Sequence, residues 1–344
     1  MAFIEEYHNA WGASSSYFAY SKKKKSVPLV IVLPENKSIM ESVYNELKLI
    51  SEIDVYMFPS YTQNPFEEAR PINNIMQVRS NTLYNIINEK DYILLTSPYA
   101  LLKKIPYKNE FLENIITLKQ GKTYAQSKLE QDLDKLGYIY VEFVTDAGEY
   151  TFRGGIADIF PVNSDNPIRI EYFDDEIESI FLYNKESQSR IKQLDNINIL
   201  PITDLIVSTL DFKNKLKEYP ALYEKAENYG KFAGYHWLAP YLNIEQSNIF
   251  EYIENYDCAC FMPNVEESVY NYYEIIKSSA NEVDNLKSFL ESKEILDLIY
   301  KNNVYIISEI TDRLESQGLL YSSTNTEFAF EKKNLYQSMT NAVT

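Results

Sequence analysis

The chain has 344 residues, 45% of them hydrophobic, so it can bury the cores of two or three globular domains. Its 33 basic and 50 acidic residues give a net charge of −17, which repels nucleic acid at long range. No run approaches the roughly 20 apolar residues that span a bilayer, and the start carries no secretory signal, so we expect a cytoplasmic protein with no membrane partner.

Residues 1–118 alternate strand-like apolar runs with amphipathic stretches. Strands are predicted at 28–34, 54–59, 91–97 and 115–118, and helices at 38–52 and 72–90. In the first helix, Ile39, Val43, Leu47 and Ile50 recur at helical spacing. Alternating strands and helices predict a mostly parallel sheet that helices cover.

The pattern changes near Lys119. A helix is predicted at 124–137, with Leu129, Leu133 and Leu136 as its buried stripe. Short β runs follow at 138–145, 148–162, 167–173, 176–184 and 197–202, separated by turn residues. We expect residues 119–203 to form an inserted α+β domain, an antiparallel meander packed on a helix.

Residues 204–344 are helical and acidic, and the apolar runs 256–263 and 302–309 are expected to rejoin the first sheet. The two cysteines, Cys258 and Cys260, are too close for an ordinary disulfide and do not have zinc-site spacing. We therefore predict buried thiols in a strand. With only His8 and His236 as histidines, we predict no metal site.

Residues 8–25, HNAWGASSSYFAYSKKKK, resemble a phosphate-binding loop, because a glycine, small hydroxyl residues and a basic cluster precede a predicted strand. Such a loop needs a second glycine and a lysine at the helix start, but Ser16, Tyr17 and Phe18 stand there. Lys22–Lys25 come more than a turn later, where solvated charge at a helix end is expected. We predict no nucleotide hydrolysis and no cofactor. A different interpretation has Lys22–Lys25 bind single-stranded DNA together with Tyr17 and Tyr20.

Asp174-Asp175 follows an apolar run, as the acidic residues of a Walker B motif do. A second strand-like run comes directly afterwards, so a hairpin turn is the better interpretation. The sequence contains no G-x-S-x-G, H-E-x-x-H or G-x-G-x-x-G motif, and we predict no catalytic residue.

In residues 167–173, the period of two puts Arg169, Glu171 and Phe173 on the face opposite to the core. Arg153 faces outward by the same logic, and Gly154-Gly155 after it permits a bulge or a close backbone approach. Arginine and an aromatic residue on a flat surface are typical of a protein–protein hot spot. The alternative is structural: Phe173 is covered by the module's own helix while Arg169 pairs with Glu171.

The run 148–201 resembles the module shared by the excision-repair protein UvrB and the bacterial transcription-repair coupling factors (Mfd). The runs 58–86, with its R-x-x-x-L helix, and 118–138 extend the resemblance, which covers about residues 1–205. UvrB has an intact Walker A motif and a long DNA-gripping hairpin. This chain has neither, so it resembles the N-terminal UvrB-homology region of the coupling factors.

The resemblance implies a degenerate RecA/helicase-like α/β domain built from two chain halves, 1–118 and 204–344, around the inserted domain 119–203. It implies a non-catalytic adaptor that binds UvrA through Arg153, Arg169 and Phe173. We expect the chain to be a monomer. In the family, DNA translocation by ATP hydrolysis and RNA polymerase binding belong to other regions. The alternative function is a UvrB-like, ATP-dependent DNA-damage-processing protein with an altered nucleotide loop.

Overall fold

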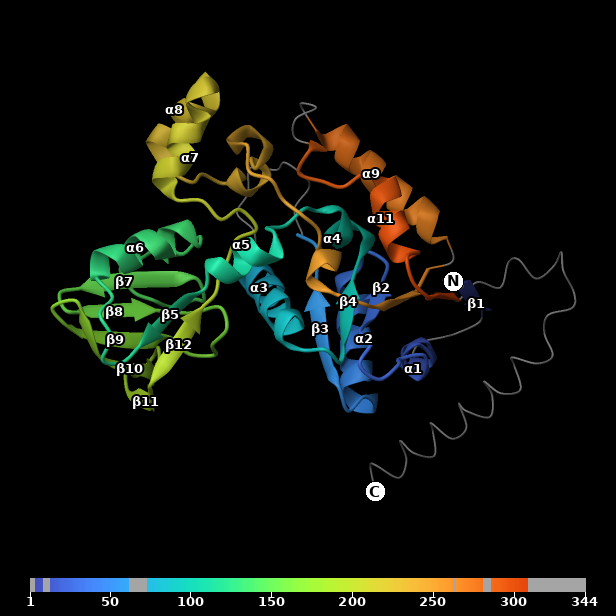
Figure 1. The fold of residues 1–344 in the computed structure, drawn as a ribbon, viewed down its shortest axis with the longest axis horizontal. Coiled ribbons are helices and arrows are strands. Elements are labelled where there is room, and N and C mark those ends of the chain that lie inside the picture. Colours follow the sequence, from blue (N-terminus) through green and yellow to red (C-terminus); the bar gives the residue numbers. More distant parts are fainter. Residues whose placement is uncertain (1–3, 9–12, 62–72, 263, 281–285, 309–344) are drawn as a thin grey trace, which may run out of the picture.

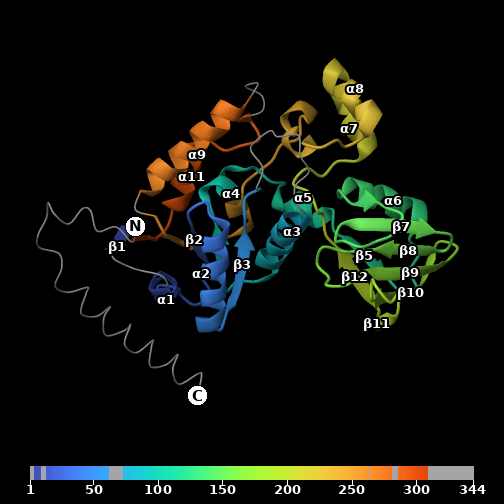
Figure 2. The same ribbon diagram turned by 180° about the vertical axis from the view of Figure 1, so that it is seen from behind.

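The computed structural model describes residues 4–8, 13–61, 73–262, 264–280 and 286–308. Figures 1 and 2 show two units side by side, with α3 (Asn73–Asn88) and α5 (Lys108–Glu113) near the boundary. We call them the parallel unit, built on a six-stranded parallel sheet, and the β module, which spans residues 116–202. The mixed α/β class expected from the sequence is confirmed.

The parallel unit takes its strands from both ends of the described chain. In the order β1-β14-β13-β2-β4-β3, they are β1 (Ile4–His8), β14 (Val304–Ser308), β13 (Asp257–Cys260), β2 (Leu29–Val32), β4 (Tyr92–Thr96) and β3 (Asp54–Phe58). All neighbouring pairs are parallel. The prediction that the runs 256–263 and 302–309 rejoin the first sheet is confirmed, while β1 was not foreseen.

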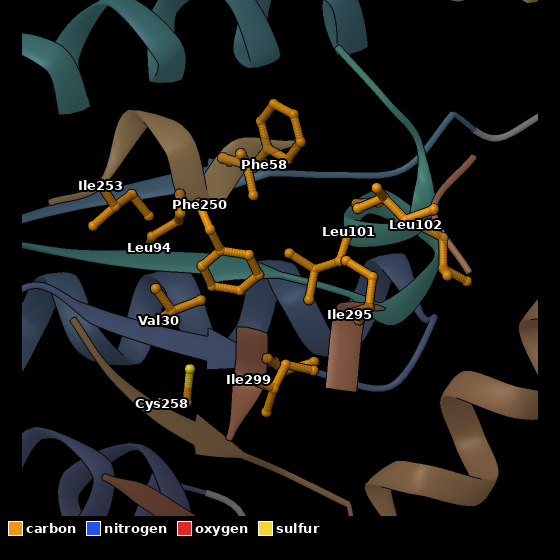
Figure 3. Close-up of a cluster of buried hydrophobic side chains, with 14 of the residues drawn as sticks. Val30, Phe58, Leu94, Leu101, Leu102, Phe250, Ile253, Cys258, Ile295 and Ile299 are labelled. Atoms are coloured by element: carbon orange, nitrogen blue, oxygen red, sulfur yellow. The ribbon is translucent and has the colours of Figure 1, made fainter. Parts of the chain in front are cut away.

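Helices cover both faces of this sheet. One face carries α1 (Ala13–Ser21) and α2 (Lys37–Ile50), and the other carries α3, α4 (Pro98–Leu102), α9 (Val265–Ser279) and α11 (Ser292–Ile299). Figure 3 shows the second of these cores, where Val30 and Cys258 of the sheet face Leu101, Ile295 and Ile299. Cys258 and Cys260 are free, buried thiols in β13, as predicted.

Helix α2 shows how local sequence sets the packing. The Asn36 side chain accepts hydrogen bonds from the backbone N–H groups of Ser38 and Ile39, which caps the helix. Its buried stripe is Met40, Val43 and Leu47. Ile39 is 38% exposed, so its predicted place in the core is wrong. Spacings of three and four from Met40 keep a single line on one face, and Ile39 lies a hundred degrees away from it.

The β module contains a six-stranded sheet whose inner face packs on α6 (Gln126–Lys135). In the order β11-β10-β9-β8-β7-β6, its strands are β11 (Arg190–Leu194), β10 (Glu176–Tyr183), β9 (Ile168–Phe173), β8 (Ile156–Ile159), β7 (Glu149–Arg153) and β6 (Ile139–Tyr140). Leu129, Leu133 and Leu136 are buried against it, as predicted. The meander is antiparallel from β7 to β11, but β6 pairs with β7 in parallel, so the fully antiparallel prediction is wrong there.

A separate two-stranded antiparallel ribbon completes the β module. It joins β5 (Ile116–Lys119) to β12 (Asn196–Ile199), and Ile116 and Leu118 are buried in the same core as α6. After β12, residues 205–242 bury a small core of their own. That segment contains α7 (Thr209–Lys215), η1 (Leu216–Glu218), α8 (Pro220–Tyr229), η2 (Tyr235–Trp237) and η3 (Pro240–Leu242), and η4 (Ile249–Tyr252) leads back to the parallel sheet.

Candidate partner-binding surface

The strand register of the β module brings Arg153, Arg169 and Phe173 onto one face. Arg153 lies opposite Ile156, and Ile156 lies opposite Glu171. Residues directly opposite each other in an antiparallel pair share a face, and so do residues two apart in one strand. Arg169, Glu171 and Phe173 of β9 therefore lie on the same face as Arg153 of β7, which we call the outer face.

Phe173 is 72% exposed at the end of β9. The chain turns back directly after it, with Asp174 in the left-handed region at φ +54° and Phe173 paired with Glu176 of β10. Asp174-Asp175 is thus a hairpin turn, as predicted, and not the end of a Walker B strand. Helix α6 packs on the inner face with Ile168 and Ile170, so the alternative in which it covers Phe173 is wrong.

Arg169 makes a bidentate ion pair with Asp158 of β8. Its Nε donates to Oδ1 over 2.7 Å, and its Nη2 donates to Oδ2 over 2.8 Å. Nη2 also donates to Oε1 of Gln188, and the guanidinium carbon lies 4.7 Å above the ring centroid of Tyr183. Hydrogen bonding to Asp158 raises the pKa of Arg169. The predicted alternative partner, Glu171, is wrong: it accepts from Ser179 and Arg190.

These contacts leave part of the Arg169 side chain exposed. The Arg169 side chain is 21% exposed and that of Asp158 is 7% exposed. Nε and Nη2 of Arg169 are engaged by Asp158 and Gln188, and the guanidinium also contacts the Tyr183 hydroxyl. A bidentate pair fixes the plane of the guanidinium, so its exposed part is presented in a defined direction.

Arg153 is exposed and lies beside the hairpin between β7 and β8. Gly154 takes up a φ of +60°, which glycine adopts without strain. A Cβ atom at Gly155 would lie 3.1 Å from the carbonyl oxygen of Tyr172, so the predicted close backbone approach is confirmed. The Arg153 guanidinium carbon lies 4.6 Å from the ring centroid of Phe143.

One end of the outer face is covered. Thr151, Asp158, Phe181 and Tyr183 are buried there. Gln188 and Lys185 of the β10–β11 connection reach Arg169 and the carbonyl of Thr145. The end that carries Arg153 and Phe173 stays open.

Sequence reasoning missed Asp158, Gln188 and Tyr183. The alternation in residues 156–159 places Asp158 on the outer face, and this was the signal that could have identified a partner for Arg169.

The segment that resembles a phosphate-binding loop, residues 8–25, begins at the end of β1 and continues through α1. Its residues 9–12 lie outside the described residues. In α1, Ser14, Ser15 and Ser16 are buried, and the Ser16 hydroxyl donates to the Glu46 carboxylate of α2. The negative charge of Glu46 beside Ser16 would repel a phosphate, which needs N–H groups or a positive charge there. Among the described residues of 8–25, no lysine lies at the N-terminus of α1, where a phosphate-binding loop would need one.

Lys22, Lys23 and Lys24 of the basic cluster after α1 form ion pairs. Lys23 pairs with Asp91, and its side chain is only 5% exposed. Lys24 pairs with Asp257 over 2.6 Å, and Lys22 lies 3.7 Å from a Glu5 oxygen. The expectation of solvated charge is wrong for Lys23, because nearby carboxylates neutralise it inside the fold. The same pairs weaken the DNA-binding interpretation.

Other kinds of site find little support. Among the described residues, no group of three or more His, Cys, Asp or Glu side chains could hold a metal ion. In the same part of the chain, no helix is both long and apolar enough to cross a membrane.

Comparisons with known proteins relate the β module and most of the rest of the chain to described proteins. Residues 116–205 match the family model described as the UvrB interaction domain. The chain is 23% identical over 320 residues to the transcription-repair-coupling factor of Haemophilus influenzae, covering 89% of this chain and 27% of that protein. For the transcription-repair-coupling factor of Rickettsia prowazekii the identity is 26% over 337 residues, covering 90% and 30%.

The transcription-repair-coupling factor of Bacillus subtilis is 26% identical over 197 residues, which cover 57% of this chain and 17% of that protein. The chain spans less than a third of the length of these curated relatives. These matches confirm the resemblance stated from the sequence: residues 116–205 are similar to the UvrB interaction domain, and most of the chain is similar to part of the transcription-repair-coupling factors.

Proposed function

We propose that this chain is a non-catalytic adaptor of transcription-coupled nucleotide excision repair that binds UvrA through the outer face of the β module. The observation that carries the proposal is that Arg153, Arg169 and Phe173 share this face inside the matched residues 116–205. Phe173 is 72% exposed, and an exposed large aromatic residue beside arginines is typical of a binding hot spot.

Each of the three side chains contributes a different contact. Phe173 enters an apolar recess of UvrA and loses its contact with water there. Arg153 donates charge-assisted hydrogen bonds to a carboxylate of UvrA. Arg169 contributes positive charge through the exposed part of its side chain, and because Asp158 already fixes its guanidinium, little side-chain freedom is lost on binding.

We infer that the parallel unit is a degenerate RecA/helicase-like scaffold without ATP hydrolysis. The absent second glycine and loop lysine support this, and so does Glu46 at Ser16. The division into residues 1–118, 119–203 and 204–344 stays a prediction. The pairing of β5 with β12 favours a start of the inserted domain near residue 116.

The test is a binding titration of the chain with purified UvrA. Phe173→Ala is the sharpest variant, because a side chain so exposed contributes little to folding. We expect it to weaken binding by about 2 kcal/mol, roughly thirtyfold. Tyr229→Ala is the matched control, since Tyr229 of α8 is also 72% exposed and lies outside the β module.

Arg169 needs a paired variant, because its removal alone leaves a buried carboxylate. Asp158→Asn with Arg169→Ala removes the guanidinium without leaving a charge behind. We expect this variant to weaken UvrA binding relative to Asp158→Asn alone. If Phe173→Ala and the paired variant both bind UvrA as tightly as the unmodified chain, the outer face is not the UvrA site.

A further inference from the structure

Phe143 is an exposed aromatic residue that the sequence patterns did not single out. It is 64% exposed, whereas Val144 next to it is buried. It follows β6, where Val141 still donates a backbone hydrogen bond to Tyr150 of β7. The segment 141–143 thus runs alongside β7 toward Arg153.

Phe143 and its neighbour hold the Arg153 side chain from two sides. The guanidinium carbon of Arg153 lies 4.6 Å from the centroid of the Phe143 ring, within the range of a cation–π contact. Nη2 of Arg153 donates to the backbone carbonyl of Glu142. In the described structure, Nε and Nη1 of Arg153 have no acceptor, so they remain for a partner.

Hydrogen bonds hold the C-terminal end of the loop that carries Phe143. The Glu149 carboxylate accepts hydrogen bonds from the backbone N–H groups of Thr145 and Asp146, over 2.8 and 2.9 Å. Lys185 donates to the Thr145 carbonyl over 3.0 Å. The loop is therefore ordered before any partner arrives, which lowers the entropy lost on binding.

Phe143 also lies at the open end of the outer face. Arg153 of β7 and Glu171 of β9 lie in line across the sheet, with β8 between them, so their backbones are about 10 Å apart. Phe173 lies two residues further along β9. Two exposed aromatic rings thus flank a guanidinium that is already oriented. Such a platform fits a partner surface with a carboxylate between apolar patches.

We propose that Phe143 positions Arg153 and forms, together with it, a second part of the UvrA-binding surface, which receives a carboxylate of UvrA. The inference rests on the proposed function, since it assumes that UvrA binds the outer face. The ring keeps the guanidinium in one plane, and UvrA covers both when it binds. Without Phe143, Arg153 keeps its charge and its hydrogen bond to the Glu142 carbonyl but loses the ring contact that fixes the plane of the guanidinium.

The experiment is a double-mutant cycle on the full chain, with UvrA binding measured by titration. We expect Phe143→Ala to weaken binding about tenfold, and Phe143→Tyr, which keeps an aromatic face, to restore it. In an Arg153→Ala background, Phe143→Ala is expected to have a clearly smaller effect. Melting temperatures within about 1 °C of the unmodified chain would exclude a folding defect, because Phe143 is largely exposed.

The outcomes separate this inference from the proposed function. If Phe173→Ala weakens UvrA binding but Phe143→Ala does not, the outer face binds UvrA and the role of Phe143 is wrong. If Phe143→Ala has the same effect with and without Arg153, Phe143 does not act through Arg153, and the inference is overturned as well. If neither Phe143→Ala nor Phe173→Ala changes binding, the proposed function itself fails.

Discussion

Arg79 of α3 donates a hydrogen bond from Nη2 to Oδ2 of Asp204, 2.7 Å away and 125 residues further along the chain. Both side chains are buried, with 2% and 7% exposed. Nη1 of Arg79 donates to the Pro59 carbonyl, and the Tyr61 hydroxyl donates to the same Asp204 oxygen. Arg79 belongs to the parallel unit, and Asp204 follows the last strand of the β module. The pair therefore joins the two units at the point where the chain leaves the β module.

Breaking this pair should strongly destabilise the fold. Asp204→Asn keeps the shape of the side chain but leaves the Arg79 charge buried without its counter-ion. We expect the free energy of unfolding to fall by about 3–5 kcal/mol. Chemical denaturation followed by circular dichroism measures it.

The control for this prediction is an exposed pair. Lys37 and Glu41 are 3.6 Å apart with side chains 80% and 55% exposed, so Lys37→Ala should change stability by less than about 1 kcal/mol. A loss below 1 kcal/mol for Asp204→Asn would mean that water reaches Arg79 and that the pair does not join the units.

The sequence predicted much of the fold because most elements have a clear period. The strands at 28–34, 54–59 and 91–97 and the helix with Leu129, Leu133 and Leu136 all follow from local patterns. Strand pairing was predicted less completely. The return of the runs 256–263 and 302–309 to the first sheet was expected, but the pairing of β5 with β12 and the parallel direction of β6 beside β7 were not, because register and strand direction depend on packing that no local pattern contains.

The candidate surface shows the same limit. The alternation of side chains along β9 correctly placed Arg169 and Phe173 on the face opposite to the core, because this inference requires the sequence of a single strand. The partner of Arg169 is Asp158, on the neighbouring strand, and it follows only from the register between β8 and β9. Phe143 lies in the strand predicted at 138–145, but only Ile139–Tyr140 form a strand there, so its position beside Arg153 comes from the structure and not from a strand period.

The Arg169–Asp158 pair predicts a pattern of stabilities. Arg169→Ala leaves the buried Asp158 carboxylate without its partner and should lower the free energy of unfolding by about 2–3 kcal/mol. Asp158→Asn with Arg169→Ala should lower it less, because no buried charge remains. Urea denaturation of the three proteins gives the comparison.

Arg190→Ala is the matched control for this pattern. Arg190 lies 3.5 Å from Glu171, and both side chains are well exposed, so a change below about 1 kcal/mol is expected. If Arg169→Ala were no more destabilising than the paired variant, the Asp158 carboxylate would be hydrated and the guanidinium would not be held by it.

The altered loop predicts that the chain does not bind ATP. Ser16 is engaged with the Glu46 carboxylate, which would repel a phosphate near α1. Calorimetric titration with ATP and magnesium should show no saturable heat up to about 1 mM, and ATP should not raise the melting temperature. Saturation below that concentration, abolished by Ser16→Ala, would place a nucleotide at α1 and support the UvrB-like alternative.

His236 predicts how stability depends on pH. Its ring is 1% exposed, and both of its nitrogens lack a hydrogen-bond partner among the described residues. Burial, followed by the charges of Lys103 and Arg79, lowers the pKa of His236 to about 3. In the unfolded chain the pKa is about 6.5, so between pH 6.5 and 3 the unfolded state binds more protons. The folded state therefore loses stability as the pH falls through this window, by up to about 1.4 kcal/mol per pH unit.

Between pH 7 and 5 most carboxylates stay ionised, and Lys103, whose pKa burial lowers to about 7, is present in both proteins, so the difference between the unmodified chain and His236→Phe reports on His236. We expect the unmodified chain to lose about 2 kcal/mol more than His236→Phe over that range. Denaturation midpoints at pH 7, 6 and 5, compared between the two proteins, measure the difference. The rings of Tyr61 and Trp237 pack against His236, with centroids 5.2 and 4.4 Å away. Parallel losses in both proteins would mean that His236 is protonated in the fold, with a carboxylate or water beside it.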